Sequence, residues 1–382
     1  MSATAIRTGQ SCAADARVAV REFHAAVMLA DPALVTFFCS SLYDLDALAD
    51  ELNRLFVGVP VLGCTTAGEI GPGGYLQHSI AGASFPADSF TVATALLPDL
   101  EHFEISRGEA CAQALLADLE RQQPRIDPAS CFALLLIDGL SLREETVVHV
   151  LQHQLGQIAL VGGSAGDDRR MQRTQVFHGG RFHDNGAVVA LVATSRPFQV
   201  FKTQHFVRTA ERLVVTEADP SQRIVREING YPAAQEYARI LGIDVADLDP
   251  NRFSEHPVVV LIDGSDYVRS IQKANPDGSL TFYSAIDAGL VLRVAHGVDL
   301  IRNVEETFAR IRAQIGPPEL VLACDCILRN LEVTQNGSKA RVGDVFRANK
   351  AVGLSTYGEQ VHGLHVNQTL TGIAIGAPRS AG

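Results

Sequence analysis

One short segment occurs three times in this chain of 382 residues. The copies are GCTTAGE at 63–69, GGSAGD at 162–167 and GLSTYGE at 353–359, and each follows an apolar run typical of a buried strand. Glycines permit a sharp turn, and hydroxyl groups can pair with main-chain amides at a strand end. The turns are therefore either structural or the rim of a small-ligand site at the carboxyl ends of strands. Because the first and third copies lie in different halves, they indicate a duplicated architecture.

The segments around these turns alternate between two periodicities. Helical spacing at 15–31, 43–56, 107–123 and 142–156 is separated by compact apolar runs at 33–39, 59–64, 131–138 and 158–162. Such alternation predicts an α/β fold in which helices flank layered sheets.

The second half of the chain has a different pattern. From residue 172 turn signals become frequent and strands predominate, with helices expected at 232–242 and 300–316. We therefore expect α+β character there, and two domains at 1–210 and 211–382. No low-complexity linker separates them, which predicts closely packed domains.

Composition excludes several classes of protein. The formal net charge of −11, without a basic cluster, argues against nucleic-acid and anionic-membrane partners. No apolar run approaches the roughly 18 residues of a membrane span, and the N-terminus lacks the apolar core of a secretory signal. The seven scattered cysteines are typical of reduced thiols. These features predict a cytoplasmic protein.

The sequence favours no catalytic motif. GGSAG matches a nucleophile elbow with Ser164 as nucleophile, but the segment after it lacks the required helical spacing. Cys64 is the other nucleophile that an enzyme would offer. Cys324 and Cys326 share one face of an expected strand, and no second cysteine pair completes a zinc site. We expect no enzymatic activity.

The stretch FKTQHFVRT at 201–209 draws attention to one histidine. If the stretch is a single strand, His205 shares the less polar face with Phe201, Thr203 and Val207. An imidazole there is either a hydrogen-bonded core residue or a metal ligand projecting into an apolar cavity.

Longer stretches carry a family resemblance. The three turns and the ending GLSTYGEQVHGLHVNQTLTGIAIG resemble the FIST domain, a two-part sensory module of bacterial signalling proteins, over about residues 33–376. VFHGGRFHDNG, FKTQHF, EINGYPAAQEYARILG and VRSIQKANPDGSL are similar to its NosP-type, nitric-oxide-sensing branch. This resemblance implies noncovalent haem b, nitric oxide as ligand, and regulation of a separate histidine kinase, diguanylate cyclase or phosphodiesterase by a ligand-dependent conformational change.

The resemblance also implies roles for particular residues. His205 is the expected axial ligand of the haem iron and His256 the second choice. His365 and Tyr357, near the third turn, are expected to shape the binding site. Arg269 or Arg208 can pair with a haem propionate through a bidentate fork, and the alternative for either arginine is an ordinary surface ion pair. A homodimer is compatible with this interpretation. The alternative is a FIST-type sensor of a small metabolite such as an amino acid, without haem.

Overall fold

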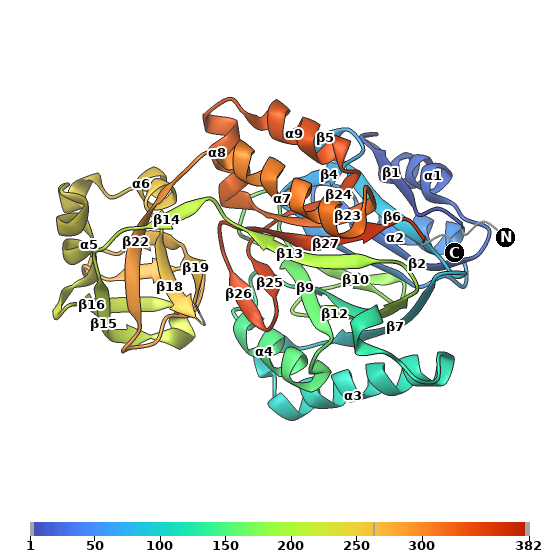
Figure 1. The fold of residues 1–382 in the computed structure, drawn as a ribbon, viewed down its shortest axis with the longest axis horizontal. Coiled ribbons are helices and arrows are strands. Elements are labelled where there is room, and N and C mark those ends of the chain that lie inside the picture. Colours follow the sequence, from blue (N-terminus) through green and yellow to red (C-terminus); the bar gives the residue numbers. More distant parts are fainter. Residues whose placement is uncertain (1–3, 263, 379–382) are drawn as a thin grey trace. The chain divides into compact units, whose positions relative to one another are not determined.

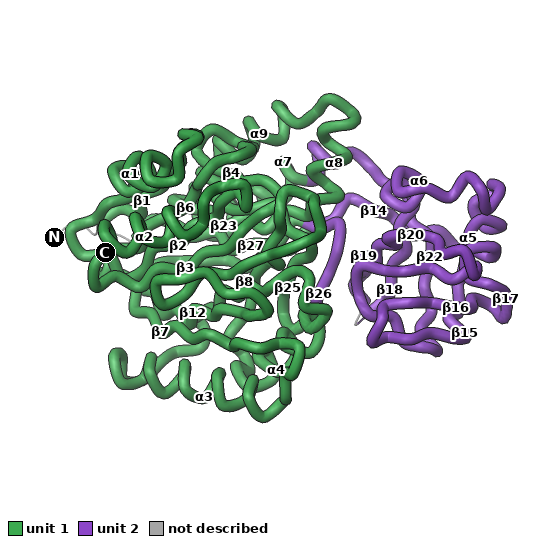
Figure 2. Tube along the Cα trace, turned by 180° about the vertical axis from the view of Figure 1, so that it is seen from behind, with its two compact units in different colours: residues 1–203, 304–364, 370–382 green, residues 204–303, 365–369 purple. Residues whose placement is uncertain are grey.

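The computed structural model describes residues 4–262 and 264–378, and the chain forms two compact units (Figure 2). Unit 1 comprises the chain up to residue 203, residues 304–364 and the chain from residue 370. Unit 2 comprises residues 204–303 and 365–369. Unit 2 is therefore inserted into the sequence of unit 1. The domains expected at 1–210 and 211–382 divide the sequence in another way and stay a prediction.

Unit 1 contains three repeats of one plan, in which strand, helix, strand, helix and strand are followed by a β-hairpin and a last strand. The first repeat is β1 (Arg7–Ser11), α1 (Ala16–Val27), β2 (Pro32–Ser40), α2 (Leu45–Leu55), β3 (Val61–Thr66), β4 (Glu69–Gly71), β5 (Gly74–Leu76) and β6 (Ile80–Pro86). The second is β7 (Phe90–Leu97), α3 (Ile105–Gln122), β8 (Cys131–Ile137), α4 (Glu144–Leu155), β9 (Ala159–Ser164), β10 (Val176–His178), β11 (Arg181–His183) and β12 (Ala187–Thr194).

The third repeat has an extra helix and is split by the insertion of unit 2. It consists of β13 (Phe198–Thr203), α7 (Leu300–Ile315), β23 (Pro318–Cys326), α8 (Ile327–Gln335), α9 (Lys339–Ala348), β24 (Ala351–Thr356), β25 (Glu359–Val361), β26 (Leu364–Val366) and β27 (Leu370–Gly376). The duplication expected from the turns is thus a triplication.

Each repeat completes its sheet with the hairpin of another repeat. The three six-stranded sheets have the orders β1-β6-β2-β3-β10-β11, β7-β12-β8-β9-β25-β26 and β13-β27-β23-β24-β4-β5. The second repeat thus lends its hairpin to the first sheet, the third to the second, and the first to the third. Because this exchange is cyclic, no repeat has a complete sheet of its own.

The cores follow from the buried faces of these sheets. Phe38, Phe132 and Cys324 belong to one apolar cluster to which all three sheets contribute. Helices cover the outer faces: α1 and α2 share a second cluster with the first sheet, and α3 and α4 share a third with the second sheet (Figure 1). The predicted α/β class, with sheets flanked by helices, is confirmed.

Unit 2 is a smaller, strand-rich body. Its elements are β14 (Phe206–Arg208), β15 (Leu213–Asp219), β16 (Ile224–Ile228), β17 (Tyr231–Pro232), α5 (Ala233–Leu241), α6 (Pro250–Glu255), β18 (Val258–Ile262), β19 (Ser265–Arg269), β20 (Ile271–Ala274), β21 (Leu280–Phe282) and β22 (Val291–Gly297). The strands lie in the order β19-β18-β22-β15-β16-β21-β20, with β14 paired to β22 and β17 to β16.

The single strand expected at 201–209 is wrong. β13 ends at Thr203 and pairs with β27, whereas β14 starts at Phe206 and pairs with β22. The Phe206 amide donates to the side chain of Gln204 (2.5 Å) rather than to a neighbouring strand. The face assigned to His205 by strand alternation therefore has no basis, although the residue is buried.

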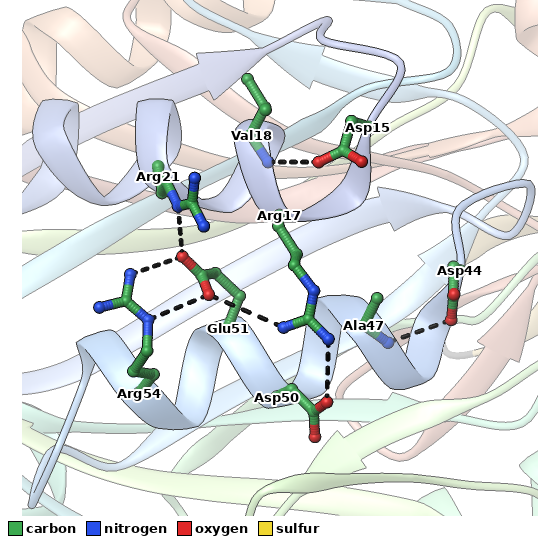
Figure 3. Close-up of polar contacts among 9 residues, drawn as sticks. All are labelled: Asp15, Arg17, Val18, Arg21, Asp44, Ala47, Asp50, Glu51 and Arg54. Atoms are coloured by element: carbon green, nitrogen blue, oxygen red, sulfur yellow. Dashed lines mark hydrogen bonds and ion pairs between the residues drawn. The ribbon is translucent and has the colours of Figure 1, made fainter.

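The helices α1 and α2 are joined by an ionic cluster (Figure 3). Glu51, with a 2% exposed side chain, meets Arg21 and Arg54 at 2.6 Å each and Arg17 at 3.9 Å. Hydrogen bonds from Arg54 and Arg21 lower the pKa of Glu51 to about 2. Asp44 caps α2 by accepting from the amide of Ala47.

We expect Glu51→Gln to reduce the free energy of unfolding at pH 7 by about 1–2 kcal/mol, since the arginines are half-exposed and partly screened. A lowered pKa in the folded state means that this contribution is present above the unfolded value of 4.5 and is lost as pH falls toward 2. Urea unfolding of wild type and Glu51→Gln at pH 7 and pH 3 measures this contribution to the free energy of unfolding. Asp50→Asn is the control, because Asp50 is exposed and pairs with the half-exposed Arg17, and should cost less than about 1 kcal/mol.

Candidate functional site

The three recurring turns lie together in unit 1, at the ends of β3, β9 and β24. Main-chain hydrogen bonds join each turn to another: Ser355 N to Gly68 O (2.7 Å), Ser164 N to Gly358 O (2.8 Å) and Gly166 N to Thr65 O (3.0 Å). The turns thus form one buried assembly in which the three repeats meet.

The first and third turns close on their own acidic residue. The Thr66 hydroxyl donates to Glu69 (2.5 Å), and the Thr356 hydroxyl donates to Glu359. Glu69 is 0% exposed and also accepts from the hydroxyl and amide of Ser79 (2.6 and 3.2 Å). Burial raises the pKa of Glu69 to about 7 despite these donors. These contacts give the two turns a structural role.

The second turn is different because its acid holds a long loop. Asp167 accepts hydrogen bonds from the amides of residues 171–173 (2.7–2.9 Å) and from the hydroxyl of Tyr357. Burial alone would raise the pKa of Asp167, but these hydrogen bonds lower it overall. The pKa of Tyr357 is raised, first by its burial and then by Asp167. From the sequence, this turn is either structural or part of a ligand site. In the structure, its loop borders a cleft.

This loop cleft has a volume of about 570 Å³. Its walls come from the end of β2, the start of α2, the loop 167–175 and β11. The lining residues are Ser41, Tyr43, Asp44, Leu45, Asp46, Ala49, Asp167, Arg170, Gln172, Arg173, Gln175, Arg181, Phe182 and Asp184. The signal for it in the sequence is the charged run DDRRMQR at 167–173, which follows the GGSAG turn and lacks helical spacing.

His205 lies in unit 2 and is 1% exposed. Its ring lies against Phe206, with centroids 4.3 Å apart, and its carbonyl accepts from the amide of Val298 (2.7 Å). Phe206 belongs to a small apolar cluster with Val259, Val268 and Ala295. The imidazole is thus bordered by apolar groups.

Arg269 and His365, both expected at the site, are in contact within unit 2. Arg269 is buried and donates to the carbonyl of His365 (3.1 Å). The adjacent Ser270 hydroxyl donates to Gln368 (2.7 Å), so β19 and the segment 365–369 are joined by polar contacts.

The remaining predicted residues lie in other places. Tyr357 belongs to the turn assembly of unit 1. His256 is half-buried at the end of α6, where its carbonyl accepts from the Tyr237 hydroxyl (2.6 Å). Arg208, the other possible propionate partner, pairs with Asp266 at 2.5 Å.

Ser164 does not have the surroundings of a nucleophile elbow. It is buried and its hydroxyl accepts from the Gln360 side chain (2.9 Å). Residues 165–175 lead from β9 through a loop into β10, where an elbow requires a helix.

Neither a clustered metal site nor a membrane-spanning helix is found in the described part of the chain. Within residues 4–262 and 264–378, no three His, Cys, Asp or Glu side chains are grouped to hold a metal ion. In the same described part of the chain, no helix is both long and apolar enough to cross a membrane.

Comparison with protein families decides the classification. The FIST N domain matches residues 33–231 and the FIST C domain matches residues 233–362. This chain belongs to the FIST family. FIST domains are sensory domains for small ligands, so the expected sensory class is confirmed at that level.

Other comparisons add little to the FIST assignment. No curated protein matches the sequence. Among solved structures, a crystal structure of cyanuric acid hydrolase from A. caulinodans aligns over 98% of this FIST chain and 99% of its own, with 10% identity and a TM-score of 0.38. A second cyanuric acid hydrolase structure, described as an evolutionary innovation by structural concatenation, aligns over 97% and 99%, also with 10% identity and a TM-score of 0.38.

Proposed function

We propose that this FIST protein senses nitric oxide through haem b held noncovalently by His205, and that it regulates a separate histidine kinase or cyclic-di-GMP enzyme. The observation that supports the proposal is the burial of His205, 1% exposed, beside an apolar cluster. Histidine is the usual neutral nitrogen ligand of haem iron, and a haem site needs apolar walls around such a ligand.

The surroundings of His205 fit a haem ligand in donor type and in polarity. Gly297, an exposed residue without a side chain, borders the ring: a Cβ atom there would lie 3.6 Å from Cδ2 and 3.7 Å from Nε2. The ring of Phe206 borders the same position, with Cε1 3.7 Å from such a Cβ atom. His205 is only 1% exposed, so haem binding requires the groups around the ring to move apart.

Bound haem would supply an iron that takes nitric oxide as a ligand. The chain itself holds the His205 backbone through the Val298 amide, and the Gln204 carbonyl through the side chain of Asn303 (3.1 Å). β14 follows directly and pairs with β22. A change in the forces on the imidazole would therefore act on β14, a strand of unit 2. If that strand shifts between two conformations, the surface presented to a kinase or cyclic-di-GMP enzyme changes with it.

Absorption spectra test the proposal. We expect the purified protein, supplied with haem and reduced, to show a Soret band that shifts with nitric oxide. His205→Ala should lose or alter the band because it removes the nitrogen ligand. His256→Ala is the matched variant and should keep the wild-type spectrum. Circular dichroism would establish that both variants are folded.

Two results would contradict the assignment. If the wild type stayed colourless with haem supplied, the small-metabolite alternative would replace haem sensing. If His256→Ala lost the band while His205→Ala kept it, His256 would be the ligand.

A further inference from the structure

We propose that the loop cleft of unit 1 binds a small molecule through a carboxylate or phosphate group, with Arg181 and Arg170 as the residues that receive the anion. This site would be distinct from the haem proposed for unit 2, and it does not depend on it.

The loop is a departure from the repeat. In the first and third repeats only Ala67-Gly68 and Tyr357-Gly358 separate the strand from its hairpin, whereas residues 165–175 do so in the second. The cleft lies at this extra segment. A feature added to one of three equivalent repeats is not needed to build the repeat, and local departures of this kind concentrate at functional sites.

The added loop has a strained but fixed conformation. Asp168, Arg169 and Met171 have φ angles of 55°, 68° and 53°, in the left-handed region that costs an L-residue about 1–2 kcal/mol. Asp167 anchors the loop from within, through the amides of residues 171–173. A rigid wall lowers the entropy lost when a ligand binds, which favours binding to this loop.

A second anchor fastens the loop to the first repeat. The carboxylate of Asp168 accepts from the Ser40 hydroxyl (3.0 Å) and from the amide and hydroxyl of Ser41 (3.0 and 2.7 Å). The two sides of the cleft, the end of β2 and the loop, are thereby held together. The cleft is a built feature of unit 1 rather than a gap between independent segments.

The cleft has the dimensions and depth of a small-molecule site. Its volume of about 570 Å³ lies within the roughly 300–1,000 Å³ that is usual for ligand pockets. Of its lining residues, Tyr43, Ala49, Asp167 and Gln175 are buried, whereas the arginines are exposed. A ligand can therefore enter from solvent and reach buried groups.

Three arginines and four aspartates line the cleft, and among the described residues two of these arginines have no carboxylate partner. Arg173 is neutralised by a bidentate pair with Asp184 (2.6 and 2.8 Å). Arg170 donates only to neutral oxygens, the Ser41 hydroxyl (2.7 Å) and the Asp167 carbonyl (3.2 Å). Within the described part of the chain, the side chain of Arg181 forms no hydrogen bond or ion pair, whereas its main chain pairs with that of His178 in the β10–β11 hairpin.

Asp44, Asp46 and Asp167 also line the cleft, but within the described residues none of their carboxylates forms an ion pair with Arg170 or Arg181. The carboxylate of Asp167 is instead bound by the amides of residues 171–173. Asp44 and Asp46 stand at the N-terminus of α2, where the helix dipole and the capped amide of Ala47 stabilise negative charge. Guanidinium groups recognise carboxylate and phosphate through paired hydrogen bonds. Arg170 and Arg181 therefore remain available for an anionic ligand.

Calorimetric titration of the full-length chain at low salt tests this site. The probes are inorganic phosphate and succinate, which separate the two anion chemistries. We expect saturable one-to-one binding of at least one probe, and Arg181→Gln should weaken it by about tenfold or more. Arg181→Lys should recover part of the affinity, since it restores the charge without the guanidinium fork.

Arg7→Gln is the control. It removes the same charge from an exposed position of β1 that does not line the cleft, and it should leave the affinity unchanged. Equal weakening by Arg7→Gln and Arg181→Gln would show a general charge effect and overturn the proposal, as would the absence of saturable binding of both probes. None of these measurements depends on haem, so failure here and failure at His205 are distinguishable.

Discussion

Replacement of Asp325 by alanine is expected to lower the free energy of unfolding by about 3–5 kcal/mol, because it takes the charged partner from a buried arginine. Asp325 is 0% exposed and Arg329 is 1% exposed, and their side chains meet at 2.8 Å. The Tyr75 hydroxyl donates to the second carboxylate oxygen at 2.5 Å. Without the carboxylate, the guanidinium of Arg329 would be left buried and the Tyr75 hydroxyl would lose its acceptor.

The effect should extend beyond one repeat. Tyr75 lies in β5 of the first repeat and Asp325 at the end of β23 in the third, so this contact joins an exchanged hairpin to the sheet that receives it. We expect Tyr75→Phe, which removes only the hydroxyl, to cost about 1–3 kcal/mol.

Urea unfolding monitored by circular dichroism measures these changes. Asp344→Ala is the matched control: Asp344 and Arg347 form an ion pair on one helix, but both are about half-exposed. The control should cost less than about 1 kcal/mol. If Asp325→Ala lowered the free energy of unfolding by no more than Asp344→Ala does, burial would not be the source of the stabilisation by the Asp325–Arg329 pair.

The pH dependence of stability should change when Glu69 is replaced by glutamine. Burial raises the pKa of Glu69 to about 7, from 4.5 in the unfolded chain, with the nearby Asp168 charge adding to the effect. A raised pKa in the folded state gives a contribution that is fully present below pH 4.5 and is lost as pH rises through 7. Because glutamine does not ionise, the free energy of unfolding of Glu69→Gln has no such loss as pH rises.

Wild type should therefore lose about 2–3 kcal/mol of stability relative to Glu69→Gln between pH 5 and pH 8. Urea unfolding of both proteins at the two pH values measures the difference, and the comparison cancels the other titrating groups. Glu120→Gln, which removes an exposed carboxylate of α3, is the control and should follow the wild type. A pH-independent difference between wild type and Glu69→Gln would contradict the raised pKa.

Much of the fold was predictable because its signals are local. The apolar runs at 33–39, 59–64 and 131–138 correspond to β2, β3 and β8 within a few residues, and the helical spacing at 43–56 corresponds to α2. Burial on both faces makes such strands continuously apolar, so their positions are readable. Helices α8 and α9 were not predicted, since Asn336 and Gly337 interrupt their spacing.

The candidate site was only partly predictable. Sequence reasoning selected His205, Arg269 and His365, all of which the structure places in unit 2, but it placed His205 within a continuous strand that does not exist. It also overlooked Arg170, which lies in a charged run, and Arg181, which follows a glycine turn, because an arginine in either place looks like a solvated surface residue. Whether such an arginine lines a cleft depends on the chain opposite it, here the end of β2 and the start of α2.

The sequence by itself determined the FIST family, the α/β class and the three glycine-acid turns, because each is a property of short segments. Only the tertiary structure decided the cyclic exchange of hairpins and the direction in which the pKa of each turn acid shifts. Glu69 and Asp167 occupy the same place in the recurring turn, yet their pKa values shift in opposite directions. Burial dominates for Glu69, whereas three amides and the Tyr357 hydroxyl stabilise the charge of Asp167. The tyrosine belongs to another repeat, and the path of the loop depends on its contacts with the first repeat, so no local pattern contains that difference.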